Sequence, residues 1–174
     1  MKQNLLETWY KRAEACHKCH FLASHRYSRY NYWIGIPTIM FTTVVGTSIF
    51  ASLSMDSRSV TATIVIGFVS IMAAILSSLQ TFLGFPERAD RHRDAGIKYG
   101  TIGRKMELLL NENEMPDGPD AVALKKELDD LGAASPKIPL DILKSFGTLY
   151  SDSSLDFDMT KDAIPSTPDA GNRE

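Results

Sequence analysis

The sequence predicts an all-α membrane protein: a two-helix transmembrane hairpin extended by long cytoplasmic helices, with a disordered C-terminal tail. Two observations predict this class. Residues 30–55 and 59–86 of the 174 contain no charged side chain, and only Asp56, Ser57 and Arg58 separate them. On both sides of this pair, apolar or small residues recur at alternating spacings of three and four, which is typical of packed helices.

The apolar parts of the two uncharged stretches cover residues 33–53 and 60–83. A helix needs about 20 residues, at 1.5 Å per residue, to cross the hydrocarbon of a bilayer. In hydrocarbon, a single helix also satisfies its own backbone hydrogen bonds. The alternative is a pair of buried helices in a soluble bundle, but such helices seldom pass 20 residues without a charged side. We therefore expect two membrane spans, with Pro37 bending the first.

The orientation follows from the basic residues. Lys and Arg side chains flank the hairpin on its two outer sides, whereas the connecting loop holds only Arg58. The positive-inside rule then places both termini in the cytoplasm and the loop outside. An aromatic belt marks the cytoplasmic entry of the first span, and it consists of Tyr27, Tyr30, Tyr32 and Trp33. No apolar core of a signal peptide is present in the first 29 residues.

Charge is segregated along the chain, whose formal net charge is −2. Residues 1–106 carry 13 basic and 6 acidic side chains, and residues 107–174 carry 6 basic and 15 acidic ones. No continuous basic groove or base-stacking pattern accompanies the basic half. We therefore expect no direct nucleic-acid binding.

Small and hydroxylated residues recur along one face of each span. Such stripes let helix backbones approach closely, and this packing is the first interpretation. In the second interpretation the hydroxyls line a pore that forms when several hairpins assemble, and one stripe can serve both purposes. The stripe residues are Thr38, Thr42, Gly46, Thr63, Gly67, Ser70, Ala74, Ser77 and Thr81.

Long helices are predicted over residues 5–30 and 86–111, and each carries a seam of the coiled-coil type. Because the two segments have nearly equal length and both adjoin a span, we expect them to form an antiparallel cytoplasmic stalk. Glycines within the second seam cost about 1 kcal/mol each against alanine, which predicts close approach of another backbone. The seam residues singled out as a candidate site are Trp9, His20, His92 and Tyr99.

After residue 111 the helical register ends. Residues 113–119 contain prolines and a glycine, and are expected to form a linker. A short amphipathic helix is predicted over 121–131, followed by an extended segment at 135–139. Residues 140–150 are expected to fold back on the stalk. The Ser-, Asp- and Pro-rich residues 151–174 are expected to be disordered.

One motif resembles a site for chemistry: Cys16-His17-Lys18-Cys19-His20 has the C-x-x-C-H pattern of c-type haem attachment. Haem attachment requires export, which the predicted topology excludes. A zinc site that uses His92 across the stalk lacks the second ligand pair that such sites usually have. We therefore expect two reduced cysteines and no metal or cofactor. No catalytic triad, carboxylate pair or phosphate loop is present, so we expect no enzymatic activity.

The arrangement of residues 5–150 resembles the SLATT domain, a two-transmembrane effector domain of bacterial conflict systems. The resemblance rests on the Trp9-x-x-x-Ala13 helix start, the aromatic entry at 27–33 and the Leu-Gly-Phe-Pro-Glu sequence at 83–87. It also rests on the helix between His92 and Tyr99 and on the Ser-Pro-Lys-Ile-Pro sequence at 135–139.

The resemblance implies a multi-pass protein of the bacterial inner membrane that acts in antiviral defence by abortive infection. It implies a homo-oligomer that permeabilises the bilayer when a cytoplasmic partner senses a nucleotide or nucleic acid. That partner would be a nucleotidyltransferase, a nucleotide sensor or a reverse transcriptase. The alternative hypothesis is a non-conducting membrane anchor that docks a cytoplasmic complex.

Overall fold

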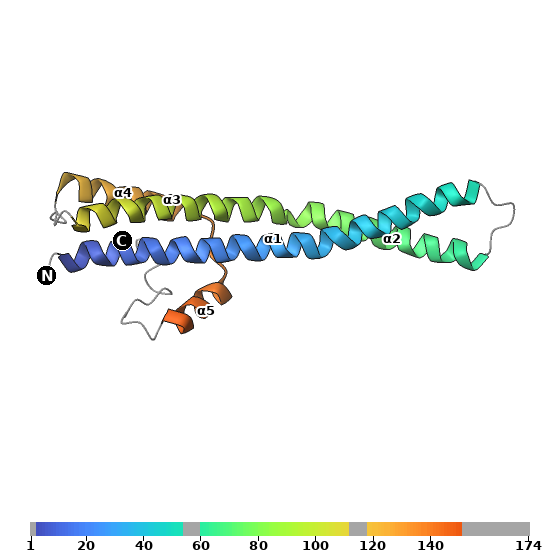
Figure 1. The fold of residues 1–174 in the computed structure, drawn as a ribbon, viewed down its shortest axis with the longest axis horizontal. Helices are drawn as coiled ribbons and strands as arrows, with labels where there is room; N and C mark the ends of the chain where they lie inside the picture. The colour runs from blue at the N-terminus through green and yellow to red at the C-terminus, as the bar shows by residue number, and fades with distance from the viewer. Residues whose placement is uncertain (1–2, 54–59, 112–117, 151–174) are drawn as a thin grey trace, which may run out of the picture. The chain divides into compact units, whose positions relative to one another are not determined.

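A computed structural model of the chain describes residues 3–53, 60–111 and 118–150, and its elements are helices (Figure 1). They are α1 (Gln3–Leu53), α2 (Val60–Leu83), α3 (Phe85–Asn111), α4 (Pro119–Ala134) and α5 (Leu140–Tyr150). The described residues contain no strand, so the predicted all-α class is confirmed. The predicted disorder of residues 151–174 and most of the predicted linker lie outside the described residues.

The chain divides into two compact units. The stalk unit comprises residues 1–24 and 90–174, and the hairpin unit comprises residues 25–89. The first predicted cytoplasmic helix and the first predicted span are parts of the single helix α1, which contributes to both units. Pro37 lies inside this helix, and the bend that we expect there stays a prediction.

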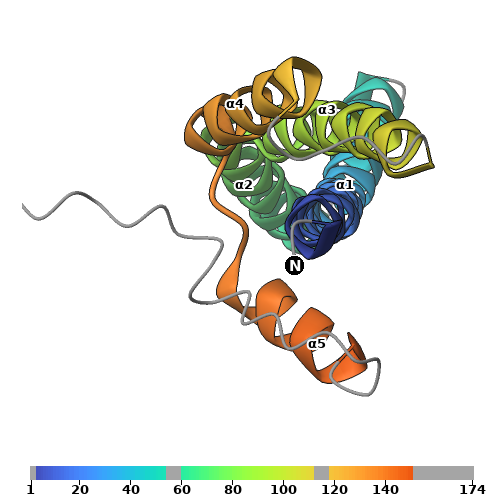
Figure 2. The same ribbon diagram turned by 90° about the vertical axis from the view of Figure 1, so that its left-hand side faces the viewer.

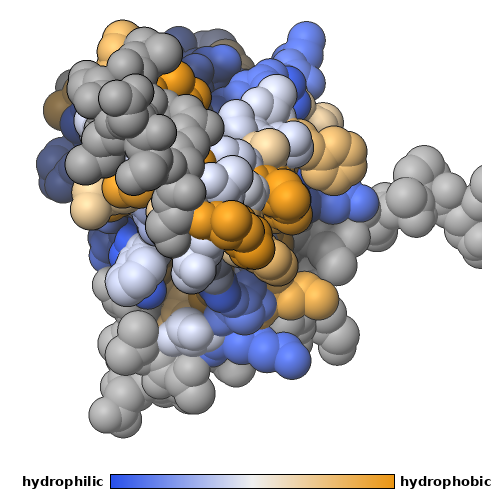
Figure 3. Space-filling view, turned by 90° about the vertical axis from the view of Figure 1, so that its right-hand side faces the viewer, coloured by the Kyte–Doolittle hydropathy of each residue, from blue (hydrophilic) through white to orange (hydrophobic). Residues whose placement is uncertain are grey.

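The hairpin unit exposes an unusually apolar surface. Both α1 and α2 are long and apolar enough to cross a membrane. Large side chains project outward along both helices; Trp33 is 74% exposed and Phe82 is 86% exposed. Figure 3 looks onto the end where α1 and α2 approach their connecting segment, and hydrophobic side chains lie at the surface there. A continuous apolar surface of this kind marks a membrane or protein interface rather than a soluble core.

Polar groups connect the two helices of the hairpin. Gln80 Nε2 in α2 donates a hydrogen bond to Asn31 Oδ1 in α1 over 3.4 Å. Gly35 makes room for the glutamine, because a Cβ at this position would lie 3.3 Å from Gln80 Nε2. Interhelical polar contacts in membranes contribute on average about 0.6 kcal/mol, so this bond orients the helices more than it stabilises them.

A single residue, Gly84, separates α2 from α3. Its φ of 53° lies in the left-handed region, which glycine enters without the steric cost that a Cβ brings. The backbone hydrogen bonds continue through the joint: Gly84 N–H donates to Gln80 O, and Arg88 N–H donates to Gly84 O. Pro86 occupies the first turn of α3, where its missing N–H has no intrahelical partner to lose.

In the stalk unit, α1 and α3 run antiparallel, as the sequence predicts. His20 contacts His92, a Cβ on Gly103 would lie 3.9 Å from Ala13 Cβ, and Leu6 shares a hydrophobic cluster with Met106. Residues that ascend along α1 therefore pair with residues that descend along α3. Side chains at alternating spacings of three and four supply this interface, which is why the sequence periodicity located it.

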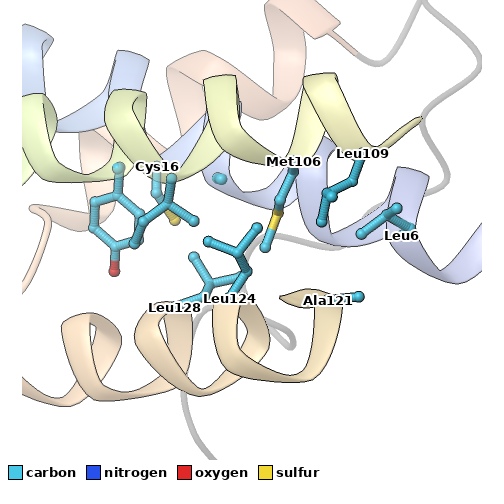
Figure 4. Packing of buried hydrophobic residues seen from close by; sticks show 10 residues of the cluster. Leu6, Cys16, Met106, Leu109, Ala121, Leu124 and Leu128 are labelled. Atoms are coloured by element: carbon cyan, nitrogen blue, oxygen red, sulfur yellow. The ribbon is translucent and has the colours of Figure 1, made fainter. Parts of the chain in front are cut away.

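Helix α4 packs beside α3 and completes the core of the stalk unit (Figure 2). Helix α4 contributes the buried residues Ala121, Leu124 and Leu128. In Figure 4 Leu124 points from α4 toward the helix that carries Met106. A salt bridge of 3.1 Å between Lys105 and Glu127 also joins α3 to α4. Helix α4 is longer than the predicted 121–131 helix, because Pro119 begins its first turn and its final turns extend to Ala134. Whether α5 folds back on the stalk stays a prediction.

We predict that Gly84→Ala lowers the thermal stability of the detergent-solubilised protein. An alanine held in the left-handed conformation costs about 1–2 kcal/mol. Gly103→Ala is the matched control, because a Cβ on this helical glycine would lie 3.9 Å from Ala13 Cβ, an ordinary contact distance. The measurement is the temperature at which the monodisperse gel-filtration peak is lost. Equal midpoints for the two variants would contradict the need for a left-handed residue at Gly84.

Candidate functional site

The C-x-x-C-H motif, residues 16–20, lies on α1 at the interface with α3. His17 Nδ1 lies 2.7 Å from the carbonyl oxygen of Gly96. A carbonyl can only accept, so His17 carries a proton on Nδ1 and donates it. His17 therefore connects α1 to the backbone of α3. The haem and zinc interpretations of the motif gave this histidine no role.

Two glycines of α3 form a notch that admits this histidine. A Cβ on Gly100 would lie 2.7 Å from His17 Nδ1, and a Cβ on Gly96 would lie 2.8 Å from a ring carbon of Phe21. The backbone carbonyl of His17 is 3.5 Å from the same Gly96 position. The glycines of the predicted seam are Gly96 and Gly103, and the predicted close approach is confirmed at Gly96, where the Phe21 ring and the His17 carbonyl approach. At Gly103 a Cβ would meet Ala13 at the ordinary contact distance of 3.9 Å, and Gly100 lies beside the predicted seam.

One helical turn along α1, His20 meets His92 of α3. Their Nδ1 atoms are 2.9 Å apart, and both rings are almost fully buried, at 1% and 3% exposure. The ring of His20 also stacks on Tyr99, with centroids 5.4 Å apart and planes 17° from parallel. In the neutral pair one imidazole donates its Nδ1 proton and the other accepts it, so each ring uses a different tautomer.

Burial keeps both histidines neutral. It lowers the pKa of His20 from 6.5 to about 4, with a smaller contribution from His92, and it lowers the pKa of His92 as well. A cation stacked on Tyr99 would gain about 0.5–2 kcal/mol, but moving a charge out of water costs several kcal/mol. Desolvation therefore outweighs the favourable stacking.

The two cysteines are free and buried. Burial raises the pKa of Cys16 to about 11 and that of Cys19 to about 12, so both are protonated thiols at neutral pH. Protonated, buried thiols are poor nucleophiles. Within the described residues, no group of three His, Cys, Asp or Glu side chains is placed to hold a metal ion.

The candidate seam residues thus have different surroundings. His20, His92 and Tyr99 come together in one buried layer, where the Tyr99 hydroxyl also approaches α4 and lies 3.7 Å from a Cβ position on Gly132. Trp9 is half-buried and packs at the edge of the hydrophobic cluster that contains Leu6. This layer is a polar insert in an otherwise apolar interface.

The stripe residues of the spans divide by exposure. Thr38 is buried, and Gly46 and Ser70 are half-buried within the single hairpin. The buried residue of α2 is Ala73, which lies one position away from the predicted stripe. The remaining stripe residues face outward, and they are Thr42, Thr63, Gly67, Ala74, Ser77 and Thr81.

Many of the hydroxyls in the spans donate to their own helix. Thr38 Oγ1 donates to Ile34 O over 2.8 Å, Thr42 Oγ1 donates to Thr38 O over 2.9 Å, and Thr81 Oγ1 donates to Ser77 O over 3.1 Å. A donor satisfied in this way no longer carries the cost of an unmade hydrogen bond in hydrocarbon. Each oxygen retains acceptor capacity for water or a neighbouring helix.

Sequence reasoning missed four residues that the structure brings into contact: His17 with Gly100, and Asn31 with Gln80. A signal for Gln80 existed, because it is the one amide within an otherwise apolar stretch of α2. The seam assignment concealed His17, because this residue lies beside the predicted seam rather than in it.

We predict that Gly100→Ala destabilises the stalk unit by about 1–3 kcal/mol, because the added methyl overlaps the His17 ring in a packed interface. Gly103→Ala is the matched control: its methyl meets Ala13 at ordinary contact distance, and alanine favours a helix by up to about 1 kcal/mol over glycine. Urea denaturation followed by reactivity of the buried cysteines measures the difference. A Gly100→Ala variant as stable as Gly103→Ala would contradict the notch.

Comparison with known proteins agrees with these features. Residues 3–136 match the family described as SMODS and SLOG-associating 2TM effector domain family 4, which covers the hairpin and most of the described stalk unit. Neither the comparison with curated proteins nor that with solved structures gave a match. Because the family match spans well over half of the sequence, the chain belongs to the SMODS and SLOG-associating two-transmembrane effector domain family.

Proposed function

We propose that the protein is a membrane effector of a bacterial anti-phage system that oligomerises and permeabilises the inner membrane after a cytoplasmic partner is activated. The single observation that carries the proposal is the exposed apolar hairpin in a chain of the two-transmembrane effector family. Family membership implies a membrane effector role in conflict systems. Oligomerisation, conduction and the trigger are the proposed parts.

Self-association is supported by the surface that the hairpin leaves open. Its internal contacts bury Thr38 and Ala73, whereas Gly67, Ala74 and Ser77 of α2 remain exposed. Small residues let a second helix approach closely, so this face suits another copy of α2. In the proposed assembly the stripe packs between hairpins rather than within one.

Conduction is supported by the chemistry of the same face. Neither span contains an ionisable side chain, so a pore cannot select ions by a ring of charges. Serine and threonine oxygens would have to hold the water. Ser77 and Thr81 are exposed and lie on one face of α2, and Thr42 is exposed on α1. The lumen would therefore be weakly polar and sensitive to dewetting.

The partner that triggers the effector is proposed to be cytoplasmic: a nucleotidyltransferase, a nucleotide sensor or a reverse transcriptase. The basic flanks of the spans support an inner-membrane topology with both termini in the cytoplasm. The stalk unit would then face the partner. The proposal requires no enzymatic activity and no nucleic-acid binding from this chain.

A non-conducting membrane anchor is the second candidate function. The hydrogen bonds of Thr38, Thr42 and Thr81 to their own helix favour it, because these hydroxyls tolerate lipid without any water-filled lumen. An anchor would dock a cytoplasmic complex through the stalk unit and leave the membrane potential unchanged.

We predict that a periplasmic-only reporter is active when inserted at Ser57 and inactive at the C-terminus. The excess of basic side chains on the two outer flanks of the hairpin dictates this orientation. Paired phosphatase and fluorescent-protein fusions at both positions measure it. An active phosphatase at the C-terminus would reject the proposed orientation.

We predict that Ser77→Val and Ser70→Val each reduce depolarisation of cells in which the partner is activated, while leaving membrane insertion intact. Valine removes the hydroxyl that holds water and puts methyl groups in its place. A membrane-potential dye gives the readout, and membrane fractionation checks insertion. Ile71→Val is the matched control, because it alters an exposed apolar side chain away from the stripe.

Two outcomes would count against conduction through the stripe. If both serine variants depolarise cells like wild type and still assemble, the stripe serves packing only. If the wild-type protein itself leaves the potential unchanged with its partner activated, the anchor becomes the better description.

A further inference from the structure

We propose that the His20–His92 pair is a proton-operated latch, which holds α3 against α1 while both rings are neutral and releases this contact when the stalk unit is acidified. The pair lies entirely within the stalk unit and joins its two long helices. The membrane-effector proposal makes no use of it.

The geometry makes the pair depend on a missing proton. With the Nδ1 atoms 2.9 Å apart, there is room for one hydrogen between them. When both Nδ1 atoms carry hydrogens, two donors face each other and the hydrogen bond is lost. A proton on the outer nitrogen Nε2 of the donating ring, the one outer nitrogen without a hydrogen in the neutral pair, instead places a charge in a site that is 1–3% exposed. Either route of protonation weakens the closed contact.

Groups from α1, α3 and α4 surround the pair. From α1 the buried groups beside His20 are the protonated thiols of Cys16 and Cys19, and from α3 the neighbour is Tyr99. The Tyr99 hydroxyl approaches α4 at Gly132, which has no side chain. The charged residue that acts on Cys16 and Tyr99 from α1 is Arg12, which is itself a cation. Burial is the first cause that lowers the pKa of His20 and of His92, so a histidinium is disfavoured while the pair is closed.

The direction of the pH dependence follows from linkage. In the closed unit the pKa of His20 is lowered to about 4, while a released histidine has its ordinary pKa of about 6.5. The released state therefore binds more protons between these values, and closure weakens as the pH falls below about 6.5. The effect is complete near pH 4. At pH 5 the opening equilibrium of His20 alone shifts on the order of 30-fold.

The latch would couple the opening of the stalk unit to the proton flow that permeabilisation causes. A permeabilised inner membrane admits protons whenever the outside is more acidic than the cytoplasm, and protonation would then loosen the stalk unit further. This connection rests on the proposed function, whereas the latch itself can be tested on the purified protein without any membrane current.

The native cysteines report the latch directly. Cys16 and Cys19 are the only thiols of the chain, and both are buried at the α1–α3 interface. The full chain in detergent is reacted with 4,4′-dithiodipyridine between pH 7.5 and pH 5, and each rate is divided by that of N-acetylcysteine at the same pH. The expected result is a rise on the order of 30-fold in the normalised rate by pH 5, reversed on return to pH 7.5.

Two variants assign the rise to the pair. The double variant His20→Leu/His92→Leu should keep the thiols protected at both pH values, because apolar replacement of a buried polar pair commonly preserves stability. His25→Gln alters an exposed histidine of the hairpin unit and should retain the wild-type rise. The latch is supported if the thiols of the double leucine variant stay unreactive at both pH values while the normalised rate of the wild type rises.

Three results would overturn the latch. One is a normalised wild-type rate that stays flat from pH 7.5 to pH 5. Another is a rise that persists in the double leucine variant, which would assign the response to another group such as His17. If the leucine variant is already unprotected at pH 7.5, the wild-type titration is extended to pH 3 and decides. A rise between pH 6.5 and pH 4 supports the pair, whereas a rise confined below pH 4 assigns the response to carboxylates and rejects the pair.

Discussion

The stalk unit depends on how closely α1 approaches α3 at Gly96 and Gly100. Only the absence of a Cβ at these positions lets the rings of His17 and Phe21 enter, and the approach then lets His17 reach a backbone carbonyl of α3. The polar layer of His20 and His92 follows one helical turn away. The cost of glycine in a helix, about 1 kcal/mol per residue, is thus offset by contacts that a larger residue would block.

The hairpin unit follows the opposite rule. Its two spans, residues 33–53 and 60–83, expose apolar side chains and contain no charged residue, and several of their polar groups bond within the unit. Threonine hydroxyls bond to carbonyls one turn earlier, and Gln80 bonds to Asn31 on the neighbouring helix. One chain therefore combines a segment folded by burial in water with a segment suited to burial in lipid, and the left-handed Gly84 separates the second span from the helix that enters the stalk unit.

The contrast between the stalk unit and the hairpin unit suits the two tasks of the proposed effector, which are regulation and permeabilisation. The two spans have no ionisable group with which to sense a signal, whereas the stalk unit holds two buried histidines whose pKa values are lowered by burial. Regulation is therefore best placed in the stalk unit, and any conduction in the hairpin unit. The two cysteines of the motif that resembles a haem or zinc site are buried in this interface, and burial raises the pKa of both thiols.

The sequence by itself determined the elements of strong periodicity: the helical class, the two apolar spans, the antiparallel pairing of α1 with α3 and the close approach at Gly96. These follow from patterns of single residues along one helix, which local physics dictates. Only the tertiary structure decided that His20 faces His92, that His17 fills the glycine notch, and that Gln80 reaches Asn31. It also separated buried Thr38 from exposed Thr42 and placed Ala73, rather than the predicted stripe, in the buried contact of α2. The physical reason is that periodicity gives the face of a helix, whereas the rotation and axial position of a neighbouring helix are fixed by how side chains from distant positions fit together.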